Sequence, residues 1–180
     1  MDLIRELRYR HGNLWDSVVN HRFVLEMGDG SLGKDQFKRY LIQDYMFIKD
    51  LVILIALGIA KANDLYYSTI LNRFLTGILN PENDYFERSF TKLNVQKEEY
   101  ETSSISPTMQ AFGDFLVRIA HEGQFEDIMM ALYVTEGTYL DWGTNLANNM
   151  DSNVDPIYKE WIELHSGIAH RHYFFRLFSV

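Results

Sequence analysis

Apolar residues recur at helical spacing along almost the whole chain, and this pattern predicts an all-α protein. A first helix is predicted over residues 2–27. Gly28 and Gly30 should end it, because glycine enters positive φ at little cost. A tight turn and a Ser31 cap then lead into a second long helix, predicted over residues 34–62.

The remaining elements are also predicted to be helical. Further helices are expected near residues 65–79, 85–93, 107–123 and 125–149, and a last one holds Tyr158, Trp161 and Leu164. Pro81 should break or kink the chain. Ser106-Pro107 and Asp155-Pro156 each place a capping side chain before a proline, which is typical of a helix start. Few β-branched alternations leave little room for a sheet, so the pattern predicts a helical bundle.

Length and composition narrow the class of protein. A chain of 180 residues is expected to form a single domain, residues 1–180, with a substantial core. It contains no cysteine, which excludes disulfides, Cys-ligated metals and thiol nucleophiles. Its net charge of −8 argues against unspecific binding to nucleic acid.

No segment of the sequence predicts membrane insertion or export. The first ten residues are charged and lack the apolar core of a signal peptide. The most apolar run, residues 51–60, is shorter than the roughly 20 residues that span a bilayer. We therefore expect a soluble cytoplasmic protein that binds neither membrane nor nucleic acid.

Asp44 is the first candidate for chemistry. On a helix, Tyr40, Phe47 and Ile48 lie three or four positions away and share its side. A carboxylate on an apolar side is costly unless it is paired or hydrogen-bonded. Two interpretations follow: Asp44 pairs with a neighbouring helix, or it accepts hydrogen bonds from the N–H groups of a small base-like ligand.

Glu136 is the second candidate. Tyr133 and Tyr139 lie three residues on either side of it, so it shares an aromatic side of its helix. Burial there would raise the carboxyl pKa and favour acid–base chemistry, although a buried ion pair would fit equally well. Gly137 and Gly143 are unusual in mid-helix, and such glycines often permit the close approach of another helix or a ligand.

Several common sites are absent from the sequence. No histidine follows a glutamate by three residues, as a ferritin-like di-iron bundle requires. There is no His-Glu-x-x-His motif and no glycine-rich phosphate loop. A lone helical histidine is more often a hydrogen-bonded structural residue than a ligand, although haem attachment through one histidine stays open.

Four segments resemble the TenA family of thiaminase II-like aminopyrimidine hydrolases. The most specific segment is the order His21, Phe23, Asp29-Gly30-Ser31-Leu32, Phe37, Tyr40-Leu41 and Gln43-Asp44-Tyr45. The other three segments are Pro107-Thr108-Met109-Gln110-Ala111-Phe112, the helix over 131–143, and Pro156-Ile157-Tyr158-Lys159-Glu160-Trp161. The resemblance implies a haem-oxygenase-like multi-helix bundle, assembled as a homotetramer without metal or cofactor.

The resemblance also assigns roles to residues. One branch of the family carries a reactive cysteine on the fifth helix, and the other carries a glutamate followed three residues later by a tyrosine. Glu136 and Tyr139 are similar to the second branch. Glu136 would then be catalytic and Asp44 would bind the aminopyrimidine edge. The ring would lie between Phe47 and Tyr139, with Phe112, Tyr133 and His165 as further substrate-binding residues.

The segment over residues 168–180 departs from the family. Family members continue with a helix that supplies a second catalytic glutamate, whereas this tail contains no acidic residue. The resemblance implies a hydrolase of thiamin-pyrimidine salvage that converts an aminomethyl- or formylaminomethyl-pyrimidine to hydroxymethylpyrimidine. Because of the tail, activity should be weak or absent unless another segment supplies the second acidic group. The alternatives are a non-catalytic aminopyrimidine-binding protein and a regulatory or structural helical bundle.

Overall fold

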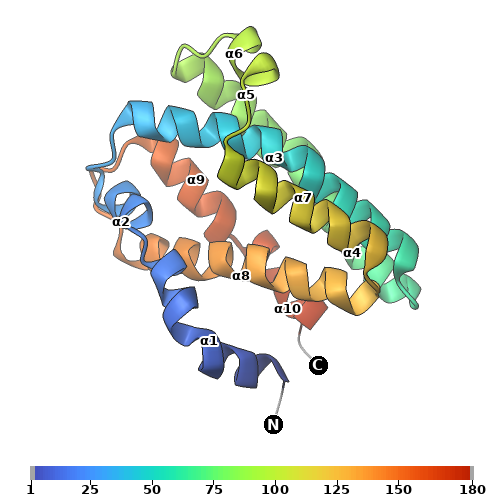
Figure 1. The fold of residues 1–180 in the computed structure, drawn as a ribbon. Helices are drawn as coiled ribbons and strands as arrows, with labels where there is room; N and C mark the ends of the chain where they lie inside the picture. Colours follow the sequence, from blue (N-terminus) through green and yellow to red (C-terminus); the bar gives the residue numbers. More distant parts are fainter. Residues whose placement is uncertain (1–2, 179–180) are drawn as a thin grey trace. The chain divides into compact units, whose positions relative to one another are not determined.

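The computed structural model describes residues 3–178 as an array of helices (Figure 1). The helices are, in chain order, α1 Leu3–Val19, α2 Arg22–Asp29, α3 Lys34–Lys61, α4 Leu65–Gly77, the π-helix η1 Ile78–Glu82, α5 Asn83–Lys92, α6 Lys97–Thr102, α7 Pro107–Glu122, α8 Phe125–Asn149, α9 Pro156–Ser166 and α10 Ile168–Phe178. No strand occurs within this range, which confirms the all-α prediction. Asp2, the predicted start of the first helix, and residues 179–180 of the tail lie outside the described residues.

Two compact units make up the chain. Unit 1 comprises Met1–Leu32 and Thr135–His170, and unit 2 comprises Gly33–Val134 and Arg171–Val180. The boundary falls inside α8, so the first ten residues of this helix belong to unit 2 and the rest to unit 1. None of the helices described over residues 3–178 is long and apolar enough to cross a membrane.

In unit 1, α1 is joined to α8 through the carboxylate of Asp141. Arg8 Nη2 and Trp15 Nε1 donate to the same Asp141 oxygen, at 2.9 and 2.8 Å. The Arg8 guanidinium also lies 3.8 Å from the centre of the Trp15 ring, which adds a cation–π contact. This cluster orders the unit around the C-terminal half of α8.

Helices α2 and α9 also pack in unit 1. The buried Tyr158 hydroxyl donates to the Leu32 carbonyl at 2.9 Å. A Cβ added to Gly28 would lie 2.4 Å from a Leu146 methyl carbon, so glycine allows α2 to approach α8 closely. These contacts fix the end of α2 and the turn that follows it.

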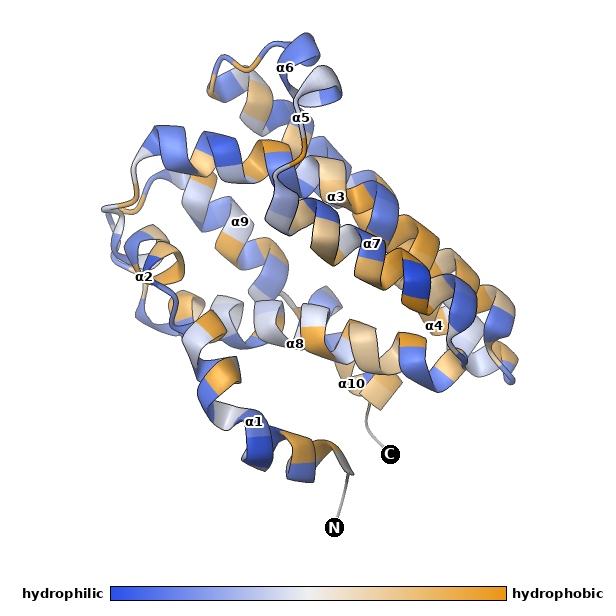
Figure 2. Ribbon diagram, viewed as in Figure 1, coloured by the Kyte–Doolittle hydropathy of each residue, from blue (hydrophilic) through white to orange (hydrophobic). Residues whose placement is uncertain are grey.

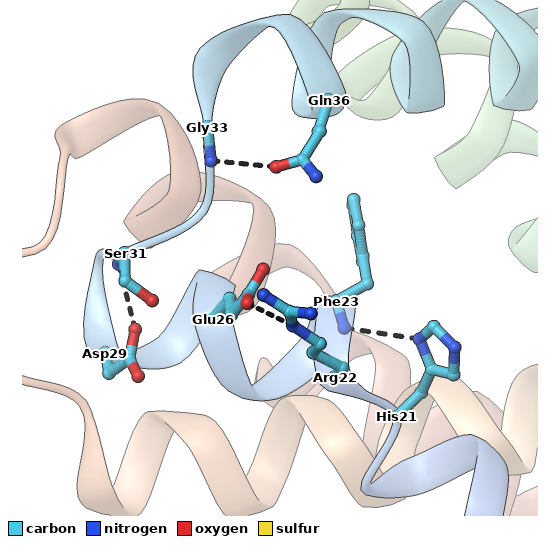
Figure 3. Close-up of polar contacts among 8 residues, drawn as sticks. All are labelled: His21, Arg22, Phe23, Glu26, Asp29, Ser31, Gly33 and Gln36. Carbon is cyan, nitrogen blue, oxygen red and sulfur yellow. Dashed lines mark hydrogen bonds and ion pairs between the residues drawn. The ribbon is translucent and has the colours of Figure 1, made fainter.

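The first predicted helix is in fact two helices. α1 ends at Val19 and α2 begins at Arg22, and the His21 ring Nδ1 accepts the Phe23 N–H at 3.2 Å (Figure 3). The prediction of one helix over 2–27 is therefore wrong. The helical spacing of apolar residues continues across the break. Histidine is not among the usual N-cap residues, so His21 did not indicate that a new helix starts there.

The turn between α2 and α3 is stabilised by local hydrogen bonds (Figure 3). Gly30 has φ of 80°, which confirms that glycine ends the preceding helix. The N-cap of α3 is Gly33 and not Ser31 as predicted: the Gly33 N–H donates to Gln36 Oε1 at 3.2 Å. The Ser31 N–H donates instead to Asp29 Oδ1 at 2.8 Å, and bonds from the Ser31 side chain and backbone lower the pKa of Asp29.

In unit 2, α3 packs along both α4 and α7. Figure 2 shows apolar stretches on all three helices. Their fully buried side chains include Leu54, Ile55, Leu71 and Leu116. Burial of apolar surface at roughly 25 cal/mol per Å² is the main force that holds such a core together.

Pro81 lies in the π-helical turn η1 between α4 and α5. This confirms the predicted break in the α-helix. The short helix α6 was not among the predicted helices. The two cap-plus-proline starts are confirmed: Ser106 Oγ accepts the Met109 N–H at 3.3 Å, and Asp155 caps α9 in the same way.

The tail forms a helix, α10, which no helical pattern had predicted. Tyr173 packs against Phe74 of α4 with ring centres 5.6 Å apart, and Leu177 is buried. The segment that departs from the family pattern therefore adds apolar side chains to the core of unit 2.

Candidate functional site

Helix α3 carries Asp44 and Phe47 one turn apart, and both side chains are buried in unit 2, at 6% and 8% exposure. The predicted placement of Asp44 on an apolar side of its helix is thus confirmed. Phe47 stacks on Phe112 of α7, with ring centres 5.2 Å apart and planes inclined by 15°. Phe112 keeps 40% of its surface exposed. Unit 2 therefore brings three of the predicted substrate-binding residues onto two adjacent helices.

Gly113 explains how α7 comes so close to α3. A Cβ at this position would lie 2.0 Å from a carboxylate oxygen of Asp50, so any larger residue would force the Asp50 side chain to move. Burial raises the pKa of Asp50, and the nearby Asp114 carboxylate raises it further. The close approach places the Phe112 ring against Phe47.

Tyr133, another predicted substrate-binding residue, contacts α10 within unit 2. Its ring centre lies 5.4 Å from that of Phe174 and 5.1 Å from that of Phe178. Two aromatic rings of the tail thus cover part of Tyr133. Its proposed role in substrate binding stays a prediction.

Glu136 and Tyr139 lie on the unit 1 part of α8, and both are half-buried. The Tyr139 ring packs against Trp142 at 5.3 Å and against His165 at 4.8 Å between ring centres. Trp142 is buried and Tyr139 is not, so the tyrosine forms the more accessible side of this cluster. Unit 1 therefore brings together Tyr139 and His165, two of the predicted substrate-binding residues.

His165 is enclosed by aromatic rings. Its Nδ1 lies 2.9 Å from the Trp161 carbonyl oxygen, which can only accept, so Nδ1 carries the proton. Burial lowers the pKa of His165 to about 3, and the neighbouring His170 contributes to this shift. His165 is therefore a neutral imidazole at physiological pH.

His170 is a residue that sequence reasoning missed. Its Nε2 lies 3.3 Å from the backbone carbonyl of Glu136, and its ring centre lies 5.8 Å from that of His165. Burial also lowers the pKa of His170. Helical spacing could not indicate this pair, because Gly167 separates the two histidines onto different helices.

Among the described residues 3–178, no group of three or more histidine, aspartate or glutamate side chains gathers in a way that could hold a metal ion.

Comparison with solved structures shows the fold. A TenA family transcription regulator from a Silicibacter species superposes with a TM-score of 0.88 at 19% identity, over 97% of this chain and 76% of that one. At this identity the likeness concerns the fold alone. TenA proteins have the all-α haem-oxygenase-like fold, so this part of the prediction is confirmed.

Two curated relatives carry the same name. An aminopyrimidine aminohydrolase from Halalkalibacterium halodurans is 31% identical over 153 residues, which cover 85% of this chain and 68% of the relative. An aminopyrimidine aminohydrolase from Bacillus subtilis is 28% identical over 167 residues, covering 93% of this chain and 70% of the relative. The model of the TENA/THI-4/PQQC family matches residues 8–174. The chain therefore belongs to the TENA/THI-4/PQQC family.

Proposed function

We propose that this chain is a hydrolase of thiamin-pyrimidine salvage. It would convert an aminomethyl- or formylaminomethyl-pyrimidine to hydroxymethylpyrimidine, with water supplying the new hydroxyl group. Asp44 carries the proposal, because a carboxylate at 6% exposure lies one helical turn from the stacked Phe47–Phe112 pair. The names of the curated relatives support the same substrate class.

Recognition of the substrate would come from complementary hydrogen bonds and stacking. An aminopyrimidine offers an exocyclic amine and a flat aromatic ring. Asp44 would accept the hydrogen bonds of the amine and ring nitrogen, and charge-assisted bonds of this kind are roughly twice as strong as neutral ones. Within unit 2, Phe47 and Phe112 would form an aromatic wall against the ring. The family resemblance assigns ring binding to Tyr139 as well. Tyr133 and His165 would complete the binding residues.

Glu136 would act on the bond that breaks. A half-buried carboxyl group can donate a proton to a leaving amine and later accept one from the attacking water. It could also attack the substrate as a nucleophile. His170 bonds to the backbone carbonyl of Glu136, and this contact helps to hold that turn of α8 in place.

Binding without turnover is the second candidate function. The observation that favours it is the composition of residues 168–180, which contain no aspartate or glutamate. If the reaction needs a second carboxyl group close to the leaving amine, residues 168–180 do not supply it. A chain that binds aminopyrimidines without hydrolysing them would then serve as a regulator or carrier.

We further propose that residues 1–180 form a single TenA-like domain, since the family match at 8–174 runs through both units. We also propose assembly as a homotetramer, which the family resemblance implies, and a cytoplasmic location, as expected from the sequence. Sedimentation of the purified chain would test the oligomeric state.

An ammonia-release assay on the aminomethylpyrimidine tests the proposed function. Saturable release of ammonia together with hydroxymethylpyrimidine is the expected result, and an intact-mass measurement would confirm the chain used. Ligand-induced thermal stabilisation without ammonia would support the binding alternative. If the aminopyrimidine gives neither turnover nor thermal stabilisation, the hydrolase and the binding alternative are both contradicted.

A further inference from the structure

A cleft of about 420 Å³ lies between α3, α5 and α6 of unit 2, apart from the residues proposed for aminopyrimidine binding. Three aromatic side chains, Tyr45, Phe90 and Tyr100, line its interior. Tyr45 directly follows Asp44, but neighbouring residues on a helix point to different sides. The volume falls within the usual range for small-molecule sites, roughly 300–1,000 Å³.

The three aromatic rings of the cleft pack against one another. Phe90 and Tyr100 stack with ring centres 4.4 Å apart and planes inclined by 13°. Tyr45 meets both of them edge-on, at 5.5 and 5.3 Å between ring centres. Phe90 is buried whereas Tyr45 and Tyr100 are half-buried, so ring surface remains accessible from the cleft.

Charged side chains also line the cleft, in addition to the three aromatic rings. Glu87, Lys97 and Glu101 line the cleft and are exposed. Lys97 and Glu101 pair at 3.4 Å, so Glu87 adds a carboxylate that this ion pair does not neutralise, and its Oε1 accepts a hydrogen bond from Asn83 Nδ2 at 3.1 Å. Burial raises the pKa of Tyr45, Tyr100 and the two glutamates raise it further, and Lys97 lowers it.

Contacts outside the cleft hold its walls in place. Lys38 of α3 pairs with Glu99 of α6 at 3.0 Å. Gln43 Nε2 donates to the Ser104 carbonyl at 3.2 Å, and Gln43 Oε1 accepts the Ser106 N–H at 2.7 Å. Because α6 and its following loop are tied to α3 at three points, the cleft is formed before any ligand binds, and preorganisation reduces the cost of binding.

We propose that this cleft binds a small organic cation with an apolar body, such as a quaternary ammonium compound. The faces of Tyr and Phe rings attract cations, and this attraction reaches ammonium ions that carry methyl groups. The apolar groups of the ligand would pack on Tyr45 and Tyr100 while its charge faces Glu87 and Glu101. This site is independent of the proposed aminopyrimidine chemistry.

Calorimetric titration with choline tests the proposal, beside a neutral isostere in which a carbon replaces the quaternary nitrogen. We expect saturable binding of choline and at least several-fold weaker binding of the isostere. Equal binding of the two probes would overturn the proposal, as would no binding of choline up to its solubility limit. Ammonia release need not be measured, so failure here would leave the proposed hydrolase untouched.

Two variants locate the binding site. Tyr100→Leu keeps an apolar side chain but removes one ring face, and should weaken choline binding about 3- to 30-fold. Glu87→Gln removes the excess charge without changing shape, and should also weaken it. Tyr66→Leu on α4 and Glu98→Gln on α6 are matched controls, because neither residue lines the cleft. If choline binding is unchanged in both Tyr100→Leu and Glu87→Gln, the cation binds elsewhere and its assignment to this cleft is refuted.

Discussion

Two aromatic clusters surround the proposed site residues, and they differ in how open they are. In unit 2, Phe112 stacks on Phe47 yet stays 40% exposed. In unit 1, Trp142 and Trp161 enclose His165, which is 5% exposed. The same kinds of residue thus form an open aromatic wall in one unit and a closed core around an imidazole in the other.

This difference indicates which property each cluster controls. An exposed ring contributes little to the core, so changes at Phe112 should alter ligand affinity more than stability. A buried polar group is costly when its environment changes, so changes around His165 should alter stability first. Glu136 lies on α8, which also carries Trp142 of the closed cluster. A Glu136 variant can test catalysis separately from the affinity and stability effects of the two clusters.

The largest effect is expected for Glu136→Gln. This variant should lose about 10²–10⁴-fold in ammonia release, because a general acid–base group is removed while the shape of the side chain is kept. Its thermal unfolding should match that of the parent chain. Glu163→Gln on exposed α9 surface is the control and should retain full activity. A Glu136→Gln chain with near-parental kcat would remove the catalytic assignment.

Acid should destabilise unit 1 through its buried histidines. The unfolded chain binds a proton at His165 below about pH 6.5, whereas in the folded chain burial lowers the pKa to about 3. The unfolded state therefore binds more protons between these values, and the free energy of unfolding should fall as pH falls. The slope is at most about 1.4 kcal/mol per pH unit for each histidine.

Urea unfolding at a series of pH values measures this slope. His172→Gln, which removes an exposed imidazole on α10, should leave the slope unchanged. Stability that stays constant from about pH 7 to about pH 4 would show that His165 and His170 take up protons in the folded chain.

Most of the fold could be predicted because the helical spacing of apolar residues directly reflects which side of each helix is buried. The predicted limits of 125–149 match α8, and the proline-containing starts of α7 and α9 were also correct. Errors arose where a break depends on one side chain, as with the His21 cap. The apolar tail gave no usable period, so α10 was missed although Leu177 is buried.

The candidate site was less predictable for a related reason. Periodicity places Asp44 and Phe47 on one side of a helix, but it does not show that Phe112 stacks on Phe47. That contact depends on the close approach at Gly113, which is a property of two helices. The contact of His170 with the Glu136 carbonyl likewise joins residues 34 positions apart in the chain.

Asp44→Asn tests recognition in the open cluster. An amide cannot accept charge-assisted hydrogen bonds from the amine and ring nitrogen together, so aminopyrimidine binding should weaken by about 1.5–3 kcal/mol. Calorimetry with the aminopyrimidine measures the change. Asp35→Asn, on the exposed first turn of α3, should bind as the parent does. Unchanged affinity in Asp44→Asn would mean that this carboxylate is structural.

Gly143→Ala tests how tightly the closed cluster is packed. The new methyl group would lie 3.0 Å from the backbone carbonyl carbon of His165, and backbone cannot move aside easily. Overpacking of this kind costs about 1–3 kcal/mol in unfolding free energy. Gly113→Ala in unit 2 should cost less, because the atom it meets belongs to the rotatable Asp50 side chain. Equal losses in the two variants would show that both clusters are equally rigid.

Phe112→Leu should give the smallest effect and separates the two clusters most directly. Leucine keeps an apolar side chain on α7 but removes the ring that stacks on Phe47 at 5.2 Å. Aromatic pairs contribute about 0.5–1.5 kcal/mol beyond the area they bury, so aminopyrimidine affinity should fall by about that amount. Phe115→Leu, on the same helix and 58% exposed, is the matched control. If Phe112→Leu lowers the melting temperature but leaves affinity unchanged, the ring belongs to the core of unit 2. The open cluster would then be structural, like the closed one, and recognition would rest on Asp44.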